Sequence, residues 1–375
     1  MRKGGFVVFV IASTVVAGAG ASAGCSSSNS IKASQDGGTT SGLACGSAPT
    51  VENTSLMQCP ATCSNAAACQ NSEPLSACCT WVAPPRDALA VGSGLHRYSA
   101  PSASTPPNLG CLATAPARGT PMTGITLTGY VWLFANGVDS QGVKVEIFEE
   151  NHPDTPDGSI AATPVGSYTT STMDEADPTD TTWNSKCPNG CQYRKYTITG
   201  IQTETPYVIR TSDAGSNGWA TLYDYNVYFP SSAVQNGQVT YDATAVAGPD
   251  LATVAGTVGQ SITPGLGLLA GEVHDCSDVR LFGATVETDQ KHQGPMFYFT
   301  EDEGDPLPSL QAGDTSHLGL FGALNMQPGQ PIRVTAVGKD PASEGQFSML
   351  GTYVVQVYPG AVTAIALRGR RPWQP

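Results

Sequence analysis

A series of short strand patterns, used twice along the chain, constrains the fold more than any other feature. Val143, Val145 and Ile147 alternate with polar residues, which is the period of a strand with one buried face. Similar runs, separated by turn residues, occupy 125–134, 196–198, 206–211 and 221–229, and then 268–273, 284–288, 296–299, 318–324, 332–337, 351–358 and 361–367. Strands at this spacing predict an all-β chain that contains two Greek-key sandwiches.

The two sets of runs match each other position by position. Gly129 and Gly142 open the first set, and Gly271 and Gly283 open the second, with spacings of 13 and 12 positions. Later positions lie 125 apart throughout, in the pairs Tyr196 and Phe321, Ile201 and Met326, Pro206 and Pro331, Tyr207 and Ile332, and Ile209 and Val334. A constant offset predicts one structural unit used twice, over about 124–247 and 265–370.

These motifs resemble the carboxypeptidase-regulatory-like, or transthyretin-like, β-sandwich modules. The resemblance rests on an opening Gly-x-Val, at 129–131 and 271–273, and on a later aromatic strand followed by Pro-x-x-Val/Ile, at 206–209 and 331–334. It implies a seven-stranded Greek-key sandwich for each copy. It implies no activity, because such modules serve as scaffolds, adhesive units or accessory domains.

The N-terminus carries the pattern of an export signal. Arg2 and Lys3 precede an apolar stretch over 6–17, which is too short to span a bilayer. Two cleavage sites are compatible with the small residues that follow. Ala-Ser-Ala at 21–23 suits ordinary signal peptidase, whereas Ser22 to Cys25 resembles a bacterial lipobox, in which Cys25 becomes the lipidated first residue.

Cysteine parity favours the lipid anchor. The chain has 11 cysteines, so an even number remains to form disulfides if Cys25 carries lipid. The Ser- and Gly-rich stretch 26–44 then forms a flexible tether. Ser26 follows the lipid cysteine, and by resemblance to Gram-negative lipoproteins this implies sorting to the outer membrane. We expect an exported protein held on the outer membrane or cell surface through Cys25.

Most of the remaining cysteines crowd into a segment with few large apolar residues, which needs covalent links to hold one shape. They are Cys45, Cys59, Cys63, Cys69, Cys78, Cys79 and Cys111. For Cys59 and Cys63 a structural zinc site is an alternative, although the spacing matches no common zinc module. Cys187 and Cys191 flank a Pro-Asn-Gly turn and are expected to bond to each other. Cys276 is left to pair with the N-terminal set.

The resulting domain plan has six parts. It comprises a signal peptide (1–24), a tether (25–44), a cysteine-rich segment with a Pro-rich linker (45–120), a first sandwich (121–247), a linker with a short helix (248–264) and a second sandwich (265–375). The helix is expected over 250–259 and packed on the second sandwich. Asp250 would cap its start, and Leu251, Val254 and Val258 share one face.

The chain offers no recognisable catalytic pattern, so we assign no catalytic residue. None of the five histidines sits in a metal-ligand motif; they are His96, His152, His274, His292 and His317. A concave pocket that joined one of them to an acidic pair would indicate a hydrolase instead.

Two sets of side chains are candidates for binding. An acidic loop can supply part of a calcium shell or form a solvated loop; its members are Asp154, Asp157, Asp174, Glu175, Asp177 and Asp180. Aromatic residues can present rings to a glycan or peptide, or pack in the core; they are Trp132, Trp183, Trp219, Tyr223 and Tyr225. Apart from calcium, no cofactor is expected.

The formal net charge of −13 argues against a nucleic-acid partner. The sequence therefore predicts a non-catalytic binding or adhesion module. Its partners would be the bilayer, through Cys25, and an envelope protein or glycan. A structural spacer or assembly subunit of the envelope is one alternative, and a hydrolase with unmarked residues on the sandwich loops is another.

Overall fold

The computed structural model describes residues 107–134, 139–151, 157–177, 192–215, 217–281, 283–289, 296–300, 306–316, 318–339 and 347–373. By internal contacts the chain divides into Met1–Thr40 and Ser41–Pro375, and all described residues belong to the second unit. The predicted signal peptide, the tether and most of the cysteine-rich segment lie outside the described residues. In the described ranges, no helix is long and apolar enough to cross a membrane.

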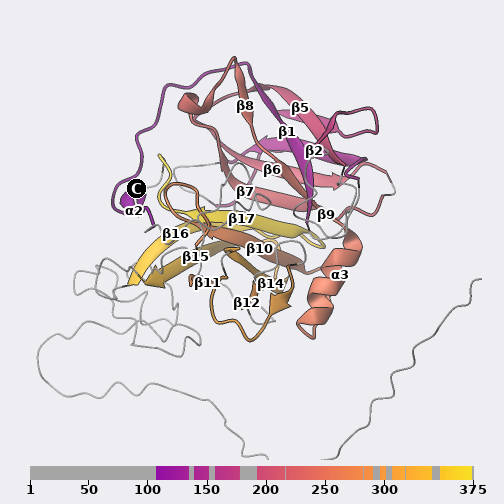
Figure 1. Cartoon of the computed structure of the whole chain (residues 1–375), viewed down its shortest axis with the longest axis vertical. Helices are drawn as coiled ribbons and strands as arrows, with labels where there is room; N and C mark the ends of the chain where they lie inside the picture. Colours follow the sequence, from indigo (N-terminus) through magenta and orange to yellow (C-terminus); the bar gives the residue numbers. More distant parts are fainter. Residues whose placement is uncertain are drawn as a thin grey trace, which may run out of the picture. The chain divides into compact units, whose positions relative to one another are not determined.

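Strands dominate the described part (Figure 1), so the all-β prediction is confirmed. What we call the first module comprises β1 (Ile125–Phe134), β2 (Val143–Glu149), β3 (Gly166–Thr169), β4 (Ala176–Asp177), β5 (Tyr193–Ile201), β6 (Pro206–Asp213), β7 (Leu222–Tyr228), η1 (Ser231–Ala233), β8 (Gln238–Thr240) and β9 (Ala243–Val246). The second module comprises β10 (Gly267–His274), β11 (Thr285–Thr288), β12 (Met296–Phe299), β13 (Pro308–Ser309), β14 (Leu320–Met326), β15 (Pro331–Lys339), β16 (Phe347–Gln356) and β17 (Val362–Arg368). Two helices, α2 (Gly110–Ala113) and α3 (Gly248–Thr257), precede the first and the second module.

Strand pairing follows the same scheme in both modules. In the first, β1 pairs antiparallel with β5 and parallel with β8 and β9, while β2 pairs with β6. In the second, β10 pairs antiparallel with β14 and parallel with β17, while β11 pairs with β15. The strands β5 and β14, and likewise β6 and β15, contain the positions that lie 125 residues apart in the sequence.

The opening glycine of each sequence repeat allows two backbones to come close together. A Cβ on Gly129 would lie 1.8 Å from the carbonyl oxygen of Tyr241, and a Cβ on Gly271 would lie 2.1 Å from that of Ile365. In both modules the approaching backbone belongs to the segment that runs parallel to the opening strand. Any larger residue would push this segment away, which explains why glycine stands at both positions.

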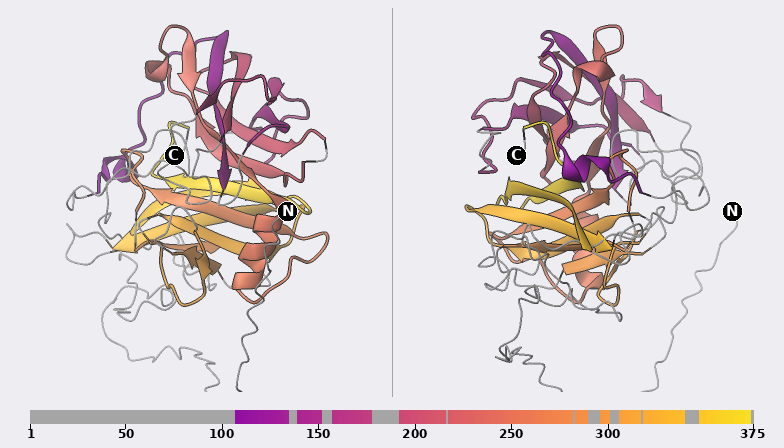
Figure 2. Two further views of the ribbon diagram at one scale, coloured as in Figure 1. Left: turned by 45° about the vertical axis from the view of Figure 1, so that its right-hand side comes forward. Right: turned by 90° about the vertical axis from the view of Figure 1, so that its left-hand side faces the viewer.

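The two modules share one sheet, which the sequence did not predict. Strand β17 pairs in parallel with β7, from Val362 opposite Leu222 to Ile365 opposite Tyr225. This pairing creates a nine-stranded sheet in the order β13-β12-β14-β10-β17-β7-β6-β2-β3. Figure 2 shows β17, in yellow, running between the strands of the two modules.

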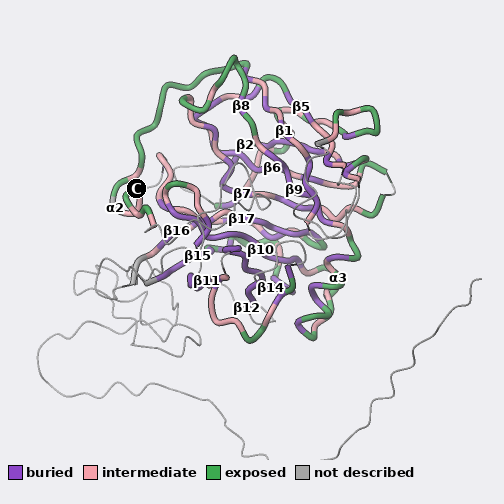
Figure 3. Tube along the Cα trace, in the orientation of Figure 1, coloured by how far each residue is buried: buried purple, intermediate pink, exposed green. Residues whose placement is uncertain are grey.

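Both faces of the shared sheet are covered. On one face, Tyr225 and Ile365 belong to the same core as Tyr353 of the three-stranded sheet β11-β15-β16. On the other face, Tyr207 of β6 packs in a core with Leu127 of the sheet that contains β1. The central strands are consequently buried along most of their length, as Figure 3 shows.

Helix α3 differs from its prediction in its start and in what it covers. It begins at Gly248 with Ala247 as the N-cap and a proline in the first turn, so Asp250 lies inside the helix rather than capping it. Proline suits this position because the first backbone N–H groups of a helix have no partner within the helix. Val254 and Val258 pack in a core that contains residues of both modules, and not of the second module alone.

Candidate functional site

A disulfide fastens the segment that contains α2 to the second module. Cys111 and Cys276 are bonded, with 5.6 Å between their Cα atoms. The backbone N–H of Cys276 donates to the carbonyl of Asn108 at 2.8 Å, and the N–H of Asn108 donates to the Asp275 carboxylate at 2.8 Å. The sequence predicted that Cys276 would pair with the N-terminal cysteines, and Cys111 is one of them.

The pairing of the other cysteines is not described. They lie outside the described residues: Cys25, Cys45, Cys59, Cys63, Cys69, Cys78, Cys79, Cys187 and Cys191. The proposed lipid anchor and the disulfide of the Pro-Asn-Gly turn therefore stay predictions.

A buried network of charges lies close to this disulfide, at the junction of the modules. Arg280 donates to both carboxylate oxygens of Glu272, at 3.0 and 3.1 Å. His274 contacts Glu272 through Nε2 and Asp278 through Nδ1, the latter at 3.0 Å, and Arg368 pairs with Asp278. Burial opposes ionisation of Glu272, but Arg280 and His274 together lower its pKa to about 2. Burial lowers the pKa of His274 to about 4.

A concave pocket that joins a histidine to an acidic pair would indicate a hydrolase, and His274 is the one histidine among the described residues. Its side chain lies between two carboxylates but is only 1% exposed, and it does not line the cavity described below. A substrate therefore cannot reach its ring nitrogens. The histidine therefore serves the interior of the second module rather than a reaction.

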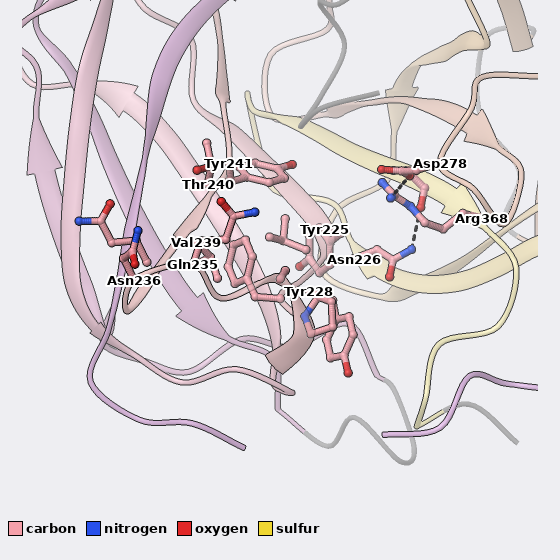
Figure 4. A pocket seen from close by; sticks show the side chains of 16 residues that line it. Tyr225, Asn226, Tyr228, Gln235, Asn236, Val239, Thr240, Tyr241, Asp278 and Arg368 are labelled. Atoms are coloured by element: carbon pink, nitrogen blue, oxygen red, sulfur yellow. Dashed lines mark hydrogen bonds and ion pairs between the residues drawn. The ribbon is translucent and has the colours of Figure 1, made fainter. Parts of the chain in front are cut away.

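A polar cavity of about 430 Å³ opens beside the network. The first module contributes the end of β7 and the turn from η1 to β8, and the second module contributes Asp278, Ala366 and Arg368. Figure 4 shows Gln235 and Asn236 at one end of the view and the Asp278–Arg368 pair at the other. The described lining residues include no serine, cysteine, lysine or histidine, and the one carboxylate among them, that of Asp278, is engaged by Arg368 and His274.

A bulge in β7 shapes the floor of this cavity. Asn226 lies in the strand with a φ of 65°, a conformation that asparagine tolerates better than most residues. Its amide donates to the carbonyl of Ala366 at 2.7 Å and accepts from Arg371 at 2.6 Å. Tyr225 and Val227, on either side of it, point into different cores. The bulge thus turns the strand and links the two modules at the same place.

The charged end of the cavity is electrically balanced. Burial and the neighbouring Arg371 lower the pKa of Arg368 to about 9, and the guanidinium pairs with Asp278. The Nε atom of Arg368 is buried and makes no hydrogen bond to the described residues. Burial also raises the pKa of Asp224 to about 6, although Tyr241 donates a hydrogen bond to its carboxylate.

The aromatic binding surface predicted from the sequence is wrong for three of its residues, which lie in the core. The ring of Trp132 stacks on Tyr193 at 4.2 Å, and Tyr223 stacks on Tyr358 at 3.9 Å. Tyr225 is 1% exposed. Tyr223 and Tyr225 lie in β7 of the shared sheet, which has both faces covered, and Trp132 lies in β1 on the side of its sheet that faces the core of the first module.

The remaining two aromatic candidates are Trp219 and Trp183. Trp219 is half-buried, and its indole N–H donates to the carbonyl of Gln141 at 3.0 Å. Trp183 lies outside the described residues.

The acidic loop does not assemble a calcium shell from its described members. Asp174 accepts hydrogen bonds from Tyr168 at 2.5 Å and from the Ser171 N–H at 2.6 Å, and Glu175 pairs with Lys195 at 2.7 Å. Across the described residues, no three acidic, histidine or cysteine side chains are placed to hold a metal ion.

Of the other four members of the loop, two lie among the described residues and two do not. Asp157 accepts from the N–H of Ser159 at 2.9 Å, and Asp177 lies in β4. Asp154 and Asp180 lie outside the described residues.

Comparison with known proteins yields little. No protein-family model and no curated protein matches the chain. Among solved structures, the shaft pilin SpaA of Lactobacillus rhamnosus GG matches at 12% identity and a TM-score of 0.20, covering 66% of this chain and 100% of that one. A major pilin of Streptococcus pyogenes matches at 11% identity and a TM-score of 0.16, covering 65% of this chain and 97% of that one. At TM-scores this low, the likeness says nothing of how this chain folds or acts.

Proposed function

We propose that the chain is a lipid-anchored structural subunit of the cell envelope, in which two sandwich modules act as one stiff body. The observation that carries this proposal is the parallel pairing of β7 with β17, which makes a single sheet of two modules. Ordinary neighbouring domains move relative to each other unless their interface is large and apolar. Here strand hydrogen bonds cross the junction, and an apolar core spans it.

Polar contacts across the junction add to the stiffness. Tyr353 of the second module donates to Glu150 of the first at 2.8 Å, and Arg371 donates to the Asn226 carbonyl at 2.6 Å. Hydrogen bonds have strict geometry, so they fix the relative orientation of the modules more narrowly than apolar contact alone. A body of this kind suits a spacer or assembly subunit.

The anchor is proposed from the sequence. The pattern of an export signal, the resemblance to a lipobox that ends at Cys25 and the Ser- and Gly-rich stretch 26–44 support the proposal that a flexible link joins the stiff body to a membrane. Outer-membrane sorting is proposed from Ser26. The resemblance to regulatory-like sandwich modules is compatible with a scaffold role.

Stiffness can be measured with a pair of spin labels, introduced as unnatural amino acids at Met173 in the first module and Leu310 in the second. Both side chains are exposed, at 91% and 47%. We expect one narrow distance distribution by pulsed electron resonance. A broad or two-peaked distribution would show that the modules move independently and would contradict the proposal that they form one stiff body.

The anchor and the structural role are tested in cells. Wild-type protein should be found in the membrane fraction, and Cys25→Ser should move it to the soluble fraction. Cells that lack the chain should leak a periplasmic reporter enzyme, and wild-type protein should stop the leak. Failure of the Cys25→Ser protein to leave the membrane fraction contradicts the anchor, and the absence of any leak contradicts the structural role.

A further inference from the structure

The polar cavity at the junction has the size of a ligand site. Its volume of about 430 Å³ lies within the range of roughly 300–1,000 Å³ that small-molecule sites span. We propose that this cavity binds a short neutral saccharide.

One end of the cavity is rich in side-chain amides. Gln235, Asn236 and Gln238 line it and are exposed, and the exposed hydroxyl of Thr240 lies on the same strand as Gln238. Each amide offers two donors and one acceptor, and a hydroxyl both donates and accepts. Sugar hydroxyl groups have the same dual character, so they can satisfy these groups in pairs.

The other end of the cavity offers a carboxylate oxygen within an ion pair that has no net charge. Arg368 and Asp278 neutralise each other, and the contacts of the Asp278 carboxylate to His274 and Arg368 both use Oδ1 and not Oδ2. A hydroxyl group of a sugar can donate to Oδ2. The balanced pair and the acidic chain disfavour an anionic ligand.

Aromatic rings line the cavity between these ends. Tyr228 and Tyr241 contribute to the lining, and their hydroxyl groups are held by Glu204 and Asp224. The ring faces are therefore fixed in place before a ligand arrives, which reduces the entropy lost on binding. Flat apolar ring surfaces beside amide groups match the alternating C–H and O–H surface of a sugar.

The saccharide site depends on the joined modules. Residues from 225 to 241 come from the first module, whereas Asp278, Ala366 and Arg368 come from the second. A bound saccharide would touch both and would stabilise the junction. This inference adds a ligand to the proposed structural role and does not require it to be correct.

Titration calorimetry of the mature full-length chain tests the site. The probes are cellobiose, maltose, lactose and chitobiose, with tri-alanine and digalacturonate as a peptide and an anionic comparison. We expect saturable binding of at least one neutral disaccharide with one site per chain. The Gln235→Ala/Gln238→Ala variant should weaken it at least tenfold, and Thr240→Tyr should abolish it by filling the cavity.

Gln311→Ala is the matched control, because Gln311 is an exposed amide outside the lining, and it should bind as the wild type does. The substituted lining positions are exposed, so the melting temperatures of the variants should stay close to that of the wild type. The proposal is overturned if no neutral disaccharide binds, if only tri-alanine or only digalacturonate binds, or if disaccharide binding survives Thr240→Tyr.

Discussion

Glu150 is a carboxyl group that is almost completely buried. It is 6% exposed and accepts hydrogen bonds from Tyr353 at 2.8 and 2.9 Å. Burial raises the pKa of Glu150 to about 7, and the hydrogen bonds from Tyr353 only partly oppose this. Because the residue joins the two modules, its protonation is coupled to the stability of their junction.

This coupling predicts a pH dependence of stability with a definite sign. Between about pH 4.5 and 7 the unfolded chain loses the Glu150 proton while the folded chain keeps it, so the free energy of unfolding falls as the pH rises. A shift from 4.5 to about 7 corresponds to roughly 3 kcal/mol. Glu150→Gln should remove this contribution, so that the variant gains stability relative to the wild type as the pH rises from 5 to 8.

Urea unfolding of wild type and variant at pH 5, 6, 7 and 8 measures the difference. Other titrating groups contribute equally to the pH dependence of both proteins, so the difference between the two proteins removes their contribution. His274 is one such group, because its lowered pKa makes the free energy of unfolding fall as the pH drops from 6.5 towards 4. Glu149→Gln is the matched control, because Glu149 is the exposed neighbour. A stability difference that does not change with pH would contradict the assignment to Glu150.

Gly271 should tolerate no side chain. A Cβ there would meet the Ile365 carbonyl at 2.1 Å and the ring of Phe321 at 2.6 Å. Gly271→Ala should therefore lower the free energy of unfolding by about 3 kcal/mol, at the upper end of typical overpacking costs. Chemical denaturation measures this. Gly256→Ala, on the exposed side of α3 with no atom nearby, should be neutral or slightly stabilising. Equal effects of the two substitutions would contradict the close-approach explanation.

The repeated glycines also show which structural features could be predicted from the type of a single residue. Gly142 and Gly283, the second glycine of each repeat, have φ values of 74° and 75°, so both make the same left-handed turn before β2 and β11. The repeat was visible because this backbone requirement fixes the residue type. Asn226 and Arg368 were missed because their roles depend on partners far away in sequence, to which no local pattern points.

At the scale of elements, the segment around α2 is held by its disulfide, by hydrogen bonds of Asn108 and by Leu109 and Leu112, which pack against the core. Removing the bond with Cys111→Ser/Cys276→Ser should lower the free energy of unfolding by about 3–5 kcal/mol, given the sequence separation of 165 residues. The amide of Cys276, which donates to Asn108, should then exchange faster with solvent. Denaturation and hydrogen exchange measure these effects.

The exposed substitution Ser232→Ala, distant from α2 in sequence, serves as the control for this variant. An unchanged exchange rate of the backbone amide at position 276 in the double variant would mean that other contacts suffice to hold α2 in place.

Most elements could be predicted because short β-branched and aromatic runs between turn residues are typical of sandwich strands. The strands at 125–134 and 296–299 have the bounds that their patterns predicted. The β7–β17 pairing was missed because each strand was interpreted within its own module. A signal existed: β17 is buried at five of its first six positions and β14 along its whole length, which is typical of strands covered on both faces.

At the scale of the whole molecule, the shared sheet makes the second repeat a structural partner of the first. The core on one face of the sheet contains Val208, Tyr223 and Tyr225 from the first module together with residues of β15 and β16. On the other face, Leu222 and Val246 pack with Leu268 and the helix α3. The core around Leu127 and Tyr207 lies wholly within the first module, but neither module buries all of its apolar surface alone, so the native packing of each depends on the other.

The separated modules should therefore not fold. A fragment over 121–247 would expose Tyr223 and Tyr225, and a fragment over 248–373 would leave β17 as an unpaired edge. We expect each fragment to aggregate or to give a poorly dispersed amide NMR spectrum. The intact chain should unfold in one transition.

A protease site inserted between positions 263 and 264 provides the control, because the cut follows folding and the two pieces should stay associated. Two fragments that each give sharp, dispersed spectra and do not bind each other would show instead that the modules are independent and that the shared sheet is a weak contact.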